Sequence, residues 1–215
     1  GAAGREETLA NAKAIVQATH LPVAADLENG FGEAPARAAE TIRLAIGVGL
    51  AGGSIEDASG DSDKPIYDFN LAVDRVAAAV EVVRAQDIPF TLTARAENFL
   101  HGRADLDDTI KRLQAFEKAG ADVLYAPGLP SLKAIKEVCA AVSRPVNVLA
   151  GATFTLKQLE DAGVKRVSVG SALCLSALAA FAKSAHEIKD FGTFNFAKDA
   201  FPFGEINKLM KEEPR

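Results

Sequence analysis

Short apolar runs and longer amphipathic segments alternate along the chain. Ser131 and Thr155 at two helix starts, and Gly120 and Gly163 at two helix ends, supply local boundary signals. The alternation, with strands that look buried, predicts a parallel α/β fold. The expected strands are residues 22–28, 52–57, 89–97, 121–128, 145–151 and 166–172. The expected helices are residues 6–18, 34–49, 68–86, 105–119, 131–142, 155–162 and 174–189.

Two parallel architectures compete, a (β/α)8 TIM-type barrel and a doubly wound open sheet. Polar residues favour the barrel, because they fall at the carboxyl ends of several strands, where barrel enzymes gather functional side chains. An open sheet usually has a glycine-rich phosphate loop after its first strand, and no G-x-G-x-x-G sequence occurs. The residues concerned are Asp26, Glu28, Glu56, Asp57, Arg95, Glu97 and Asn147.

The strand count falls two short of a closed eight-stranded barrel, and the chain opens with a helix. Position 1 is Gly, and the single Met is Met210. We therefore expect strands 1 and 2 of the barrel to be missing from the N-terminus. Residues 1–215 would then form a single barrel domain, with strands 3–8 and the C-terminal helices.

Charge and composition limit the classes of partner that the protein could bind. The net charge of −5 comes from mixed acids and bases without a basic run, which predicts neither a nucleic-acid nor a membrane partner. No apolar stretch reaches the roughly 18 residues that a membrane span needs, and no signal peptide opens the chain. Cys139 and Cys174 lie in apolar, helix-like segments without metal-ligand spacing, which is typical of buried thiols in a reducing cytoplasm.

The stretch "LPVAADLENGFG" brings two acids to the end of the first strand. Asp26 and Glu28 should point the same way, because side chains alternate along a strand. Glu56 ends the next strand, so oxygen ligands would converge, as Mg²⁺ or Mn²⁺ prefers. The alternative is that these acids cap helices or pair with Lys and Arg at the barrel rim. Gly30 would let the backbone turn close to a ligand and is predicted to bind substrate.

Two further strands carry candidate substrate contacts. Arg95, in "LTARAEN", could bind a substrate carboxylate bidentately, with Glu97 holding it; the alternative is a structural Arg–Glu pair. Asn147 is an amide in an apolar strand, and it should hydrogen-bond either substrate or a neighbouring strand. The turn "RVSVGSAL" could cradle a phosphate on backbone amides, but a plain strand-to-helix turn explains it equally well.

Five motifs together resemble the isocitrate lyase / phosphoenolpyruvate mutase superfamily. They are "ADLENGFG", "GGSIED", "LTARAEN", "PVNVLAG" and "GVKRVSVGSAL", and the likeness covers nearly the whole chain. The resemblance implies a (β/α)8-type barrel whose eighth helix is exchanged within a homodimer or homotetramer. It also implies Mg²⁺-dependent making or breaking of a C–C or C–P bond next to an α-oxo or α-hydroxy carboxylate, through an enolate-like intermediate.

The resemblance also assigns roles by position. Asp26 matches the direct metal ligand, whereas Glu28, where relatives commonly carry Asp, and Glu56 match acids that hold metal-bound water. Arg95 matches the substrate-binding arginine, so Arg95 and Glu56 are the predicted catalytic residues. Ala96 follows where relatives carry Thr.

A departure lies after "SIED". The lyases carry a K-K-C-G-H-type lid there, whereas this chain reads "ASGDSDKPIYDF" without a Cys. This excludes the usual route of isocitrate cleavage and points to a phosphonomutase-like branch. Lys64 could act as the mutase lid lysine does, but the loop alignment does not decide this.

These observations predict a metal-dependent lyase or phosphonomutase-like enzyme. A barrel that binds an α-oxo acid and a metal without turnover, and a phosphate-binding biosynthetic barrel, stay open as alternatives. In the family, the N-terminal segment supplies a loop that grips the substrate carboxylate. We therefore expect full activity to require residues upstream of Gly1, and activity of this exact chain would contradict that expectation.

Overall fold

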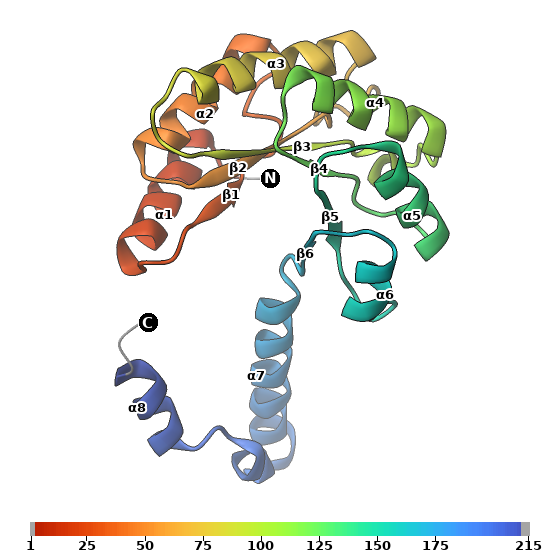
Figure 1. The fold of residues 1–215 in the computed structure, drawn as a ribbon. Coiled ribbons are helices and arrows are strands. Elements are labelled where there is room, and N and C mark those ends of the chain that lie inside the picture. Colours follow the sequence, from red (N-terminus) through yellow and green to blue (C-terminus); the bar gives the residue numbers. More distant parts are fainter. Residues whose placement is uncertain (1–2, 212–215) are drawn as a thin grey trace. The chain divides into compact units, whose positions relative to one another are not determined.

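A six-stranded parallel sheet forms the centre of the computed structural model, which describes residues 3–211 (Figure 1). The strands pair in chain order, and each connection carries one helix, so the predicted strand count and parallel α/β class are confirmed. The strands are β1 (Ala24–Asp26), β2 (Gly52–Glu56), β3 (Thr91–Arg95), β4 (Val123–Tyr125), β5 (Val146–Leu149) and β6 (Arg166–Ser168).

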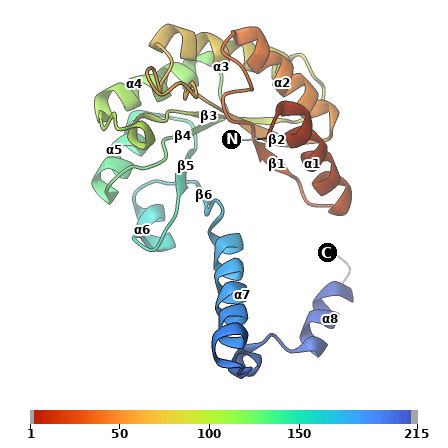
Figure 2. The same cartoon turned by 180° about the vertical axis from the view of Figure 1, so that it is seen from behind.

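The connecting helices cover one face of this sheet (Figures 1 and 2). Consecutive parallel strands with helices outside them make a half-barrel, which confirms the barrel-type fold over the doubly wound alternative. Helix α1 (Arg5–Ala18) precedes the sheet. The connecting helices are α2 (Pro35–Gly47), α3 (Phe69–Arg84), α4 (Leu106–Ala119), α5 (Leu132–Ala141) and α6 (Leu156–Asp161), and a short 3₁₀ helix, η1 (Asn98–His101), precedes α4.

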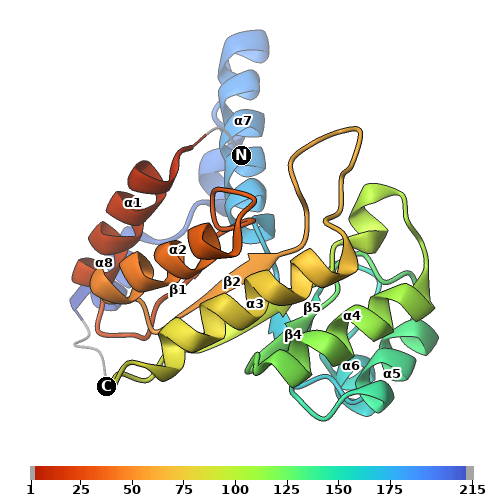
Figure 3. The ribbon, with the colours of Figure 1, turned by 90° about the horizontal axis from the view of Figure 1, so that it is seen from above.

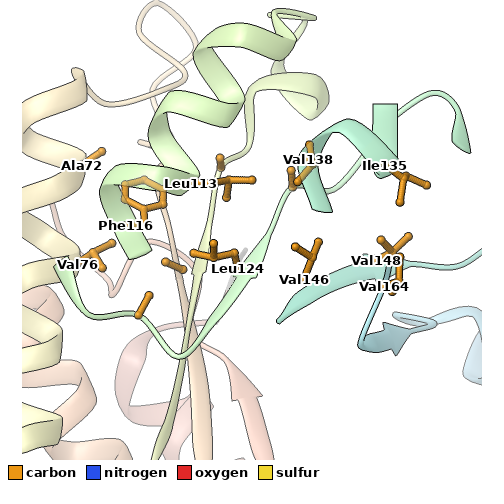
Figure 4. Packing of buried hydrophobic residues seen from close by; sticks show 14 of the residues in the cluster. Ala72, Val76, Leu113, Phe116, Leu124, Ile135, Val138, Val146, Val148 and Val164 are labelled. Atoms are coloured by element: carbon orange, nitrogen blue, oxygen red, sulfur yellow. The ribbon is translucent and has the colours of Figure 1, made fainter. Parts of the chain in front are cut away.

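The hydrophobic core lies between the sheet and these helices. Leu113 and Phe116 of α4 face Leu124 of β4 in Figure 4, and all three are almost fully buried. A second cluster packs α1 and α2 against β2 and β3, with Ile42 and Ile55 among its members. Because the apolar side chains of the strands point outward to the helices, their alternate neighbours point to the opposite face.

Local signals set the helix boundaries as predicted. Ser131 accepts a hydrogen bond from the Ala134 N–H (3.2 Å), and Thr155 forms a capping box with Gln158. Gly120 follows α4 with φ 107°. A Cβ at Gly120 would lie 2.8 Å from Val80, so close packing as well as the left-handed backbone requires glycine there.

The first strand is shorter than predicted. β1 ends at Asp26, and Glu28 lies beyond it in a turn with φ 49°, so the expectation that both acids share one strand face is wrong. The Glu28 N–H donates to Asp26 Oδ1 (3.0 Å), and the Gly30 N–H donates to the Leu27 carbonyl (2.8 Å). An aspartate that hydrogen-bonds two residues ahead competes with strand pairing, which explains why the strand stops.

A long loop connects β2 to α3 and extends beyond the end of β2 (Figure 3). It closes on itself through an antiparallel bridge between Ala58 and Ile66 and a hydrogen bond from the Ser59 N–H to the Pro65 carbonyl (2.9 Å). Beside it lies a cavity of about 240 Å³, lined by Asn29 from the β1–α2 loop and by Lys64 among others. The lysine singled out in the sequence thus lies on this loop, exposed to solvent.

The chain divides into two compact units, the second of which begins at Val169. That unit holds α7 (Ala172–Phe191), η2 (Asn195–Asp199) and α8 (Phe203–Lys211). Its described helices bury no residue, and Cys174 is exposed whereas Cys139 in the first unit is half-buried, so the expectation of two buried thiols is wrong. Among the described residues, no helix is long and apolar enough to cross a membrane.

Candidate active site

One transverse row of side chains crosses the carboxyl end of the sheet. Strand register aligns Glu56 with Arg95, Arg95 with Tyr125, Tyr125 with Asn147, and Asn147 with Arg166. Aligned residues on parallel strands point to the same face, which here is the face opposite the helices. The inner face of the half-barrel therefore carries a continuous polar row at the end where barrel enzymes place their chemistry.

Arg95 lies at the centre of the acidic half of this row. Its guanidinium forms ion pairs with Asp26, with Glu56 (Nη2–Oε2, 3.1 Å) and with Glu97 (Nη2–Oε1, 2.8 Å). Its Nε also donates to the same Glu97 oxygen (2.8 Å), so two nitrogens of Arg95 converge on Oε1. The side chain of Arg95 is 11% exposed and that of Asp26 is 60% exposed, so the cluster reaches from a buried interior to solvent.

Burial and neighbouring charges together set the protonation of these groups. The pKa of Glu56 is raised to about 7: burial is the largest cause, Arg95 opposes it, and Glu97, Asp26 and Glu28 add to it. Burial lowers the pKa of Arg95, but Asp26, Glu97 and Glu56 together hold it above its usual range. One permanent cation thus faces three carboxylates, and one of these is close to half protonated at neutral pH.

The turn after β1 brings Glu28 close to β2. The Glu56 N–H donates to the Glu28 carbonyl (3.0 Å), and Ser54 Oγ lies 3.3 Å from Asp26 Oδ1. Gly30 is buried, and its carbonyl accepts a hydrogen bond from Thr41 Oγ1 (2.8 Å). A Cβ there would lie 2.9 Å from the Ala38 Cα, so packing against α2 explains this glycine. Its role as a substrate contact stays a prediction.

The other half of the row is a network of hydrogen bonds between neutral groups and one arginine. Asn147 is buried, donates to Ser168 Oγ (3.0 Å) and accepts from Arg166 Nε (2.9 Å). Arg166 also donates to Thr93 Oγ1 (3.0 Å) on β3. Of the two partners expected for Asn147, the structure shows the neighbouring strand, and substrate binding by Asn147 stays a prediction.

Tyr125 lies between the two halves. Its ring is 5.2 Å from the Arg95 guanidinium carbon, a cation–π distance. Burial raises the pKa of Tyr125, while Arg95 and a hydrogen bond with Ser168 lower it. Tyr125 therefore links the charged cluster around Arg95 to the hydrogen-bonded network around Asn147.

This geometry bears on the predicted metal ligands. Asp26 and Glu56 meet at one guanidinium, and Glu28 is close enough to raise the pKa of Glu56. Nevertheless, within residues 3–211 no group of three or more His, Cys, Asp or Glu side chains is arranged to hold a metal ion. The assignment of Asp26, Glu28 and Glu56 to a metal stays a prediction.

The sequence pattern does not identify several residues in or behind the site. The sequence pattern places Tyr125 and Thr93 in strands, Arg166 and Ser168 in the strand and turn of "RVSVGSAL", and Arg112 in a helix, without marking their side chains as part of the site. The register of a parallel sheet could have found Tyr125 and Arg166, because each occupies the strand position next to a predicted site residue. Nothing local to the helix signals that Arg112 reaches Asp57.

The fold and the polar row define an α/β half-barrel with a charged site at the carboxyl end of its strands. The sequence profile of the phosphoenolpyruvate phosphomutase family matches residues 1–189. The chain therefore belongs to this family, within the phosphoenolpyruvate mutase/isocitrate lyase superfamily, as the motifs predicted. This superfamily includes lyases and mutases.

Solved structures give further comparisons. A crystal structure of a proposed lyase/mutase from Burkholderia cenocepacia J2315 is 53% identical, with a TM-score of 0.93 over 98% of this chain and 77% of that one. A proposed phosphonomutase from the same strain is 36% identical, with a TM-score of 0.81 over 87% of this chain and 79% of that one.

Among curated proteins, the 2-methylisocitrate lyase of Escherichia coli K12 is 31% identical over 170 residues. The match covers 74% of this chain and 56% of the lyase. The chain thus spans between about half and three-fifths of the length of the first curated relatives it matches.

Proposed function

We propose that this chain carries the metal- and substrate-binding centre of a Mg²⁺-dependent lyase or phosphonomutase-like enzyme. The reaction makes or breaks a C–C or C–P bond next to an α-oxo or α-hydroxy carboxylate and passes through an enolate-like intermediate. The observation that carries the proposal is the cluster in which Arg95 meets Asp26, Glu56 and Glu97 at the carboxyl end of the strands.

The charge balance of this cluster fits a divalent cation. Three carboxylates share one guanidinium, and Glu97, Asp26 and Glu28 add to the larger effect of burial in raising the pKa of Glu56. Carboxylate oxygens and bound waters are the ligands that Mg²⁺ and Mn²⁺ prefer. Asp26, which is largely exposed, would hold the ion directly, and Glu28 and Glu56 would hold its waters. When bound, the ion supplies Lewis-acid stabilisation of developing enolate charge.

The protein side chains have separate tasks in this proposal. Arg95 binds the substrate carboxylate, since its guanidinium is held in place by the contacts of Nε and Nη2 with Glu97 Oε1. Tyr125, stacked near Arg95, and Asn147 shape the inner face next to it. Glu56, with its pKa of about 7, can hold or release a proton near neutral pH.

The names of the relatives support both C–C and C–P chemistry, so the choice between them is left to experiment. The loop sequence after β2, which has no Cys, argues against the isocitrate lyase route. We also propose a cytoplasmic homodimer or homotetramer with an exchanged C-terminal helix, in which residues 1–215 belong to one barrel domain. The exposed apolar side chains of α7, such as Leu173 and Phe181, support an assembly that covers them.

A substrate panel tests this function. The 215-residue chain, and the longer protein where residues precede Gly1, is mixed with α-oxo and 2-hydroxy dicarboxylates and with phosphonopyruvate, with Mg²⁺ or with EDTA. Proton and phosphorus NMR follow bond cleavage or rearrangement. We expect Mg²⁺-dependent conversion of at least one compound by the longer protein. Thermal stabilisation without conversion would favour the non-catalytic barrel, and stabilisation by inorganic phosphate alone would favour the phosphate-binding barrel.

A further inference from the structure

A buried ion pair lies behind the candidate site. Arg112 of α4 contacts Asp57, the residue that follows β2, with an Nη1–Oδ2 distance of 3.1 Å. Their side chains are 3% and 1% exposed, so neither reaches solvent or a ligand on the inner face of the sheet. A pair this deeply buried is costly unless each group makes further hydrogen bonds, and the contacts of both groups therefore indicate what the pair holds in place.

One set of contacts joins Asp57 of this ion pair to the backbone that carries Arg95. The Asp57 N–H donates to the Arg95 carbonyl (3.2 Å), and the second oxygen of Asp57 accepts from the Glu97 N–H (2.8 Å). The Glu97 carboxylate, 3% exposed, then accepts from two nitrogens of Arg95. Asp57 thus fixes the backbone on both sides of Ala96, and Glu97 transmits this position to the guanidinium of Arg95.

Other contacts tie the same pair to neighbouring segments. Arg112 Nη1 donates to the Tyr67 carbonyl (3.0 Å), and the Tyr67 N–H donates to the Asp57 carbonyl (2.8 Å), so both ends of the β2–α3 loop are held together. Arg112 Nε donates to Asp108 Oδ2 (2.8 Å), which also accepts from Asn98 Nδ2 (2.7 Å). The guanidinium therefore lies where the loop, the segment after β3 and α4 meet.

We propose that Arg112 is a positioning residue for Arg95, acting through Asp57 and Glu97. The inference rests on the proposed function insofar as Arg95 binds the substrate carboxylate. The geometry requires arginine in particular, because its rigid fork reaches Asp57 and the Tyr67 carbonyl through Nη1 and Asp108 through Nε. A lysine ammonium is a single point at the end of a flexible stem and cannot span these groups in the same way.

The competing explanation is that Arg112 only stabilises the fold. Arg112→Lys separates the two explanations when it is compared with Val138→Ala, which removes a fully buried apolar group between α5 and β5 without touching the site. Arg95→Lys and the Arg95→Lys/Arg112→Lys double variant complete a double-mutant cycle, which isolates the coupling between the two arginines. Asp108→Asn, which weakens only one contact of Arg112, serves if Arg112→Lys does not fold.

Two readouts are measured on folded protein well below each melting temperature. The first is solvent exchange of the Arg95 Nε–H, followed by ¹⁵N NMR and assigned by its loss in Arg95→Lys. It requires no ligand, because this N–H donates to Glu97 in the protein itself. The second is the affinity for oxalate in the presence of Mg²⁺, since this planar dianion resembles the enolate of an α-oxo acid.

We expect Arg112→Lys to speed Nε–H exchange and to weaken oxalate binding by about tenfold or more, because small misplacements of a binding group are costly. Val138→Ala should change neither, and the effect of Arg112→Lys on affinity should largely vanish when Arg95 is already lysine. Unchanged exchange in Arg112→Lys, or an equal change in Val138→Ala, would overturn the inference. If the unmodified protein bound no oxalate, the proposed function would fail, and the exchange measurement would still decide the role of Arg112.

Discussion

The two halves of the polar row differ in how their side chains are held. In the β1–β3 half, Arg95 is surrounded by carboxylates, and its neighbours are fixed by ion pairs. In the β4–β6 half, Asn147 and Ser168 are fixed by hydrogen bonds, and Arg166 contacts the amide of Asn147 and the hydroxyl of Thr93. The same sheet register produces both halves, so the difference comes from residue type alone.

This difference indicates that the two halves of the row have different functions. Ion pairs among crowded groups respond to added charge, because a cation or an anionic ligand changes the protonation and geometry of every member. In the β4–β6 half, Arg166 bonds to neutral groups, which do not change protonation when charge is added, so its hydrogen bonds mainly fix shape. We therefore expect the β1–β3 half to bind the charged parts of metal and substrate, and the β4–β6 half to orient the inner surface beside them.

The largest effect should follow from removing the central cation. Arg95→Met leaves Asp26, Glu56 and Glu97 facing one another and removes the proposed contact with the substrate carboxylate. Truncating one partner of a buried charge pair costs about 2–5 kcal/mol, which corresponds to a loss in kcat/KM of up to about 5,000-fold. Steady-state kinetics on the converted substrate measures it.

The matched control for this variant is Arg84→Met. Arg84 is half exposed and pairs with Asp122 before β4, at the opposite end of the strands. It should keep kcat/KM within about twofold of the unmodified protein, because exposed ion pairs contribute little. Equal losses in the two variants would remove the distinction between the two ends of the sheet.

The next effect is a pH dependence of stability in metal-free protein. Glu56 has a pKa of about 7 in the folded chain against an ordinary value of 4.5, so the folded state holds its proton more tightly. Stability should therefore be highest below about pH 4.5 as far as this group is concerned, and should fall as pH rises toward 7. The loss is at most about 3 kcal/mol, and Asp57, with a pKa raised by burial to about 6, adds to it in the same direction.

Urea denaturation in EDTA at pH 5 and pH 8 measures this difference. Glu56→Gln has no ionisable group at this position and should lose less stability between the two pH values than the unmodified protein. If both proteins lost the same amount, the raised pKa of Glu56 would not be the cause. Mg²⁺ should reduce the loss in the unmodified protein, because a cation favours the ionised carboxylate.

The smallest effect should come from the β4–β6 half. Asn147→Ala leaves Ser168 and Arg166 without their shared partner, which costs about 1–3 kcal/mol of stability. Because this half sets shape, kcat/KM should fall by no more than about tenfold. Asn70→Ala, at an exposed position at the start of α3, is the control for the chemistry of the substitution. A loss of activity in Asn147→Ala as large as that in Arg95→Met would contradict the different functions of the two halves.

The sequence predicted the fold because hydrophobic period and helix caps are local signals. The strand and helix positions followed from period, and Ser131, Thr155 and Gly120 act as expected. The structure also brings Asp26, Glu56 and Arg95 together, since residues at the ends of neighbouring parallel strands share one edge.

Other features depend on geometry that local patterns do not encode. Glu28 leaves the strand because Asp26 accepts its N–H, a competition between turn and strand that alternation alone does not predict. Arg112 lies 55 residues from Asp57 in sequence, and only the packing of α4 brings them into contact. Tyr125 and Arg166 lie on strands that the sequence did identify, and strand register was the missing step.

The central claim is that the acidic half of the row binds a divalent cation together with an anionic ligand. Isothermal titration of oxalate into the protein, with Mg²⁺ and with EDTA, tests it most directly. The account predicts binding that requires Mg²⁺ and that is lost in Arg95→Met but kept in Arg84→Met. Oxalate affinity that is the same with and without Mg²⁺, or the same in Arg95→Met and the unmodified protein, would contradict it.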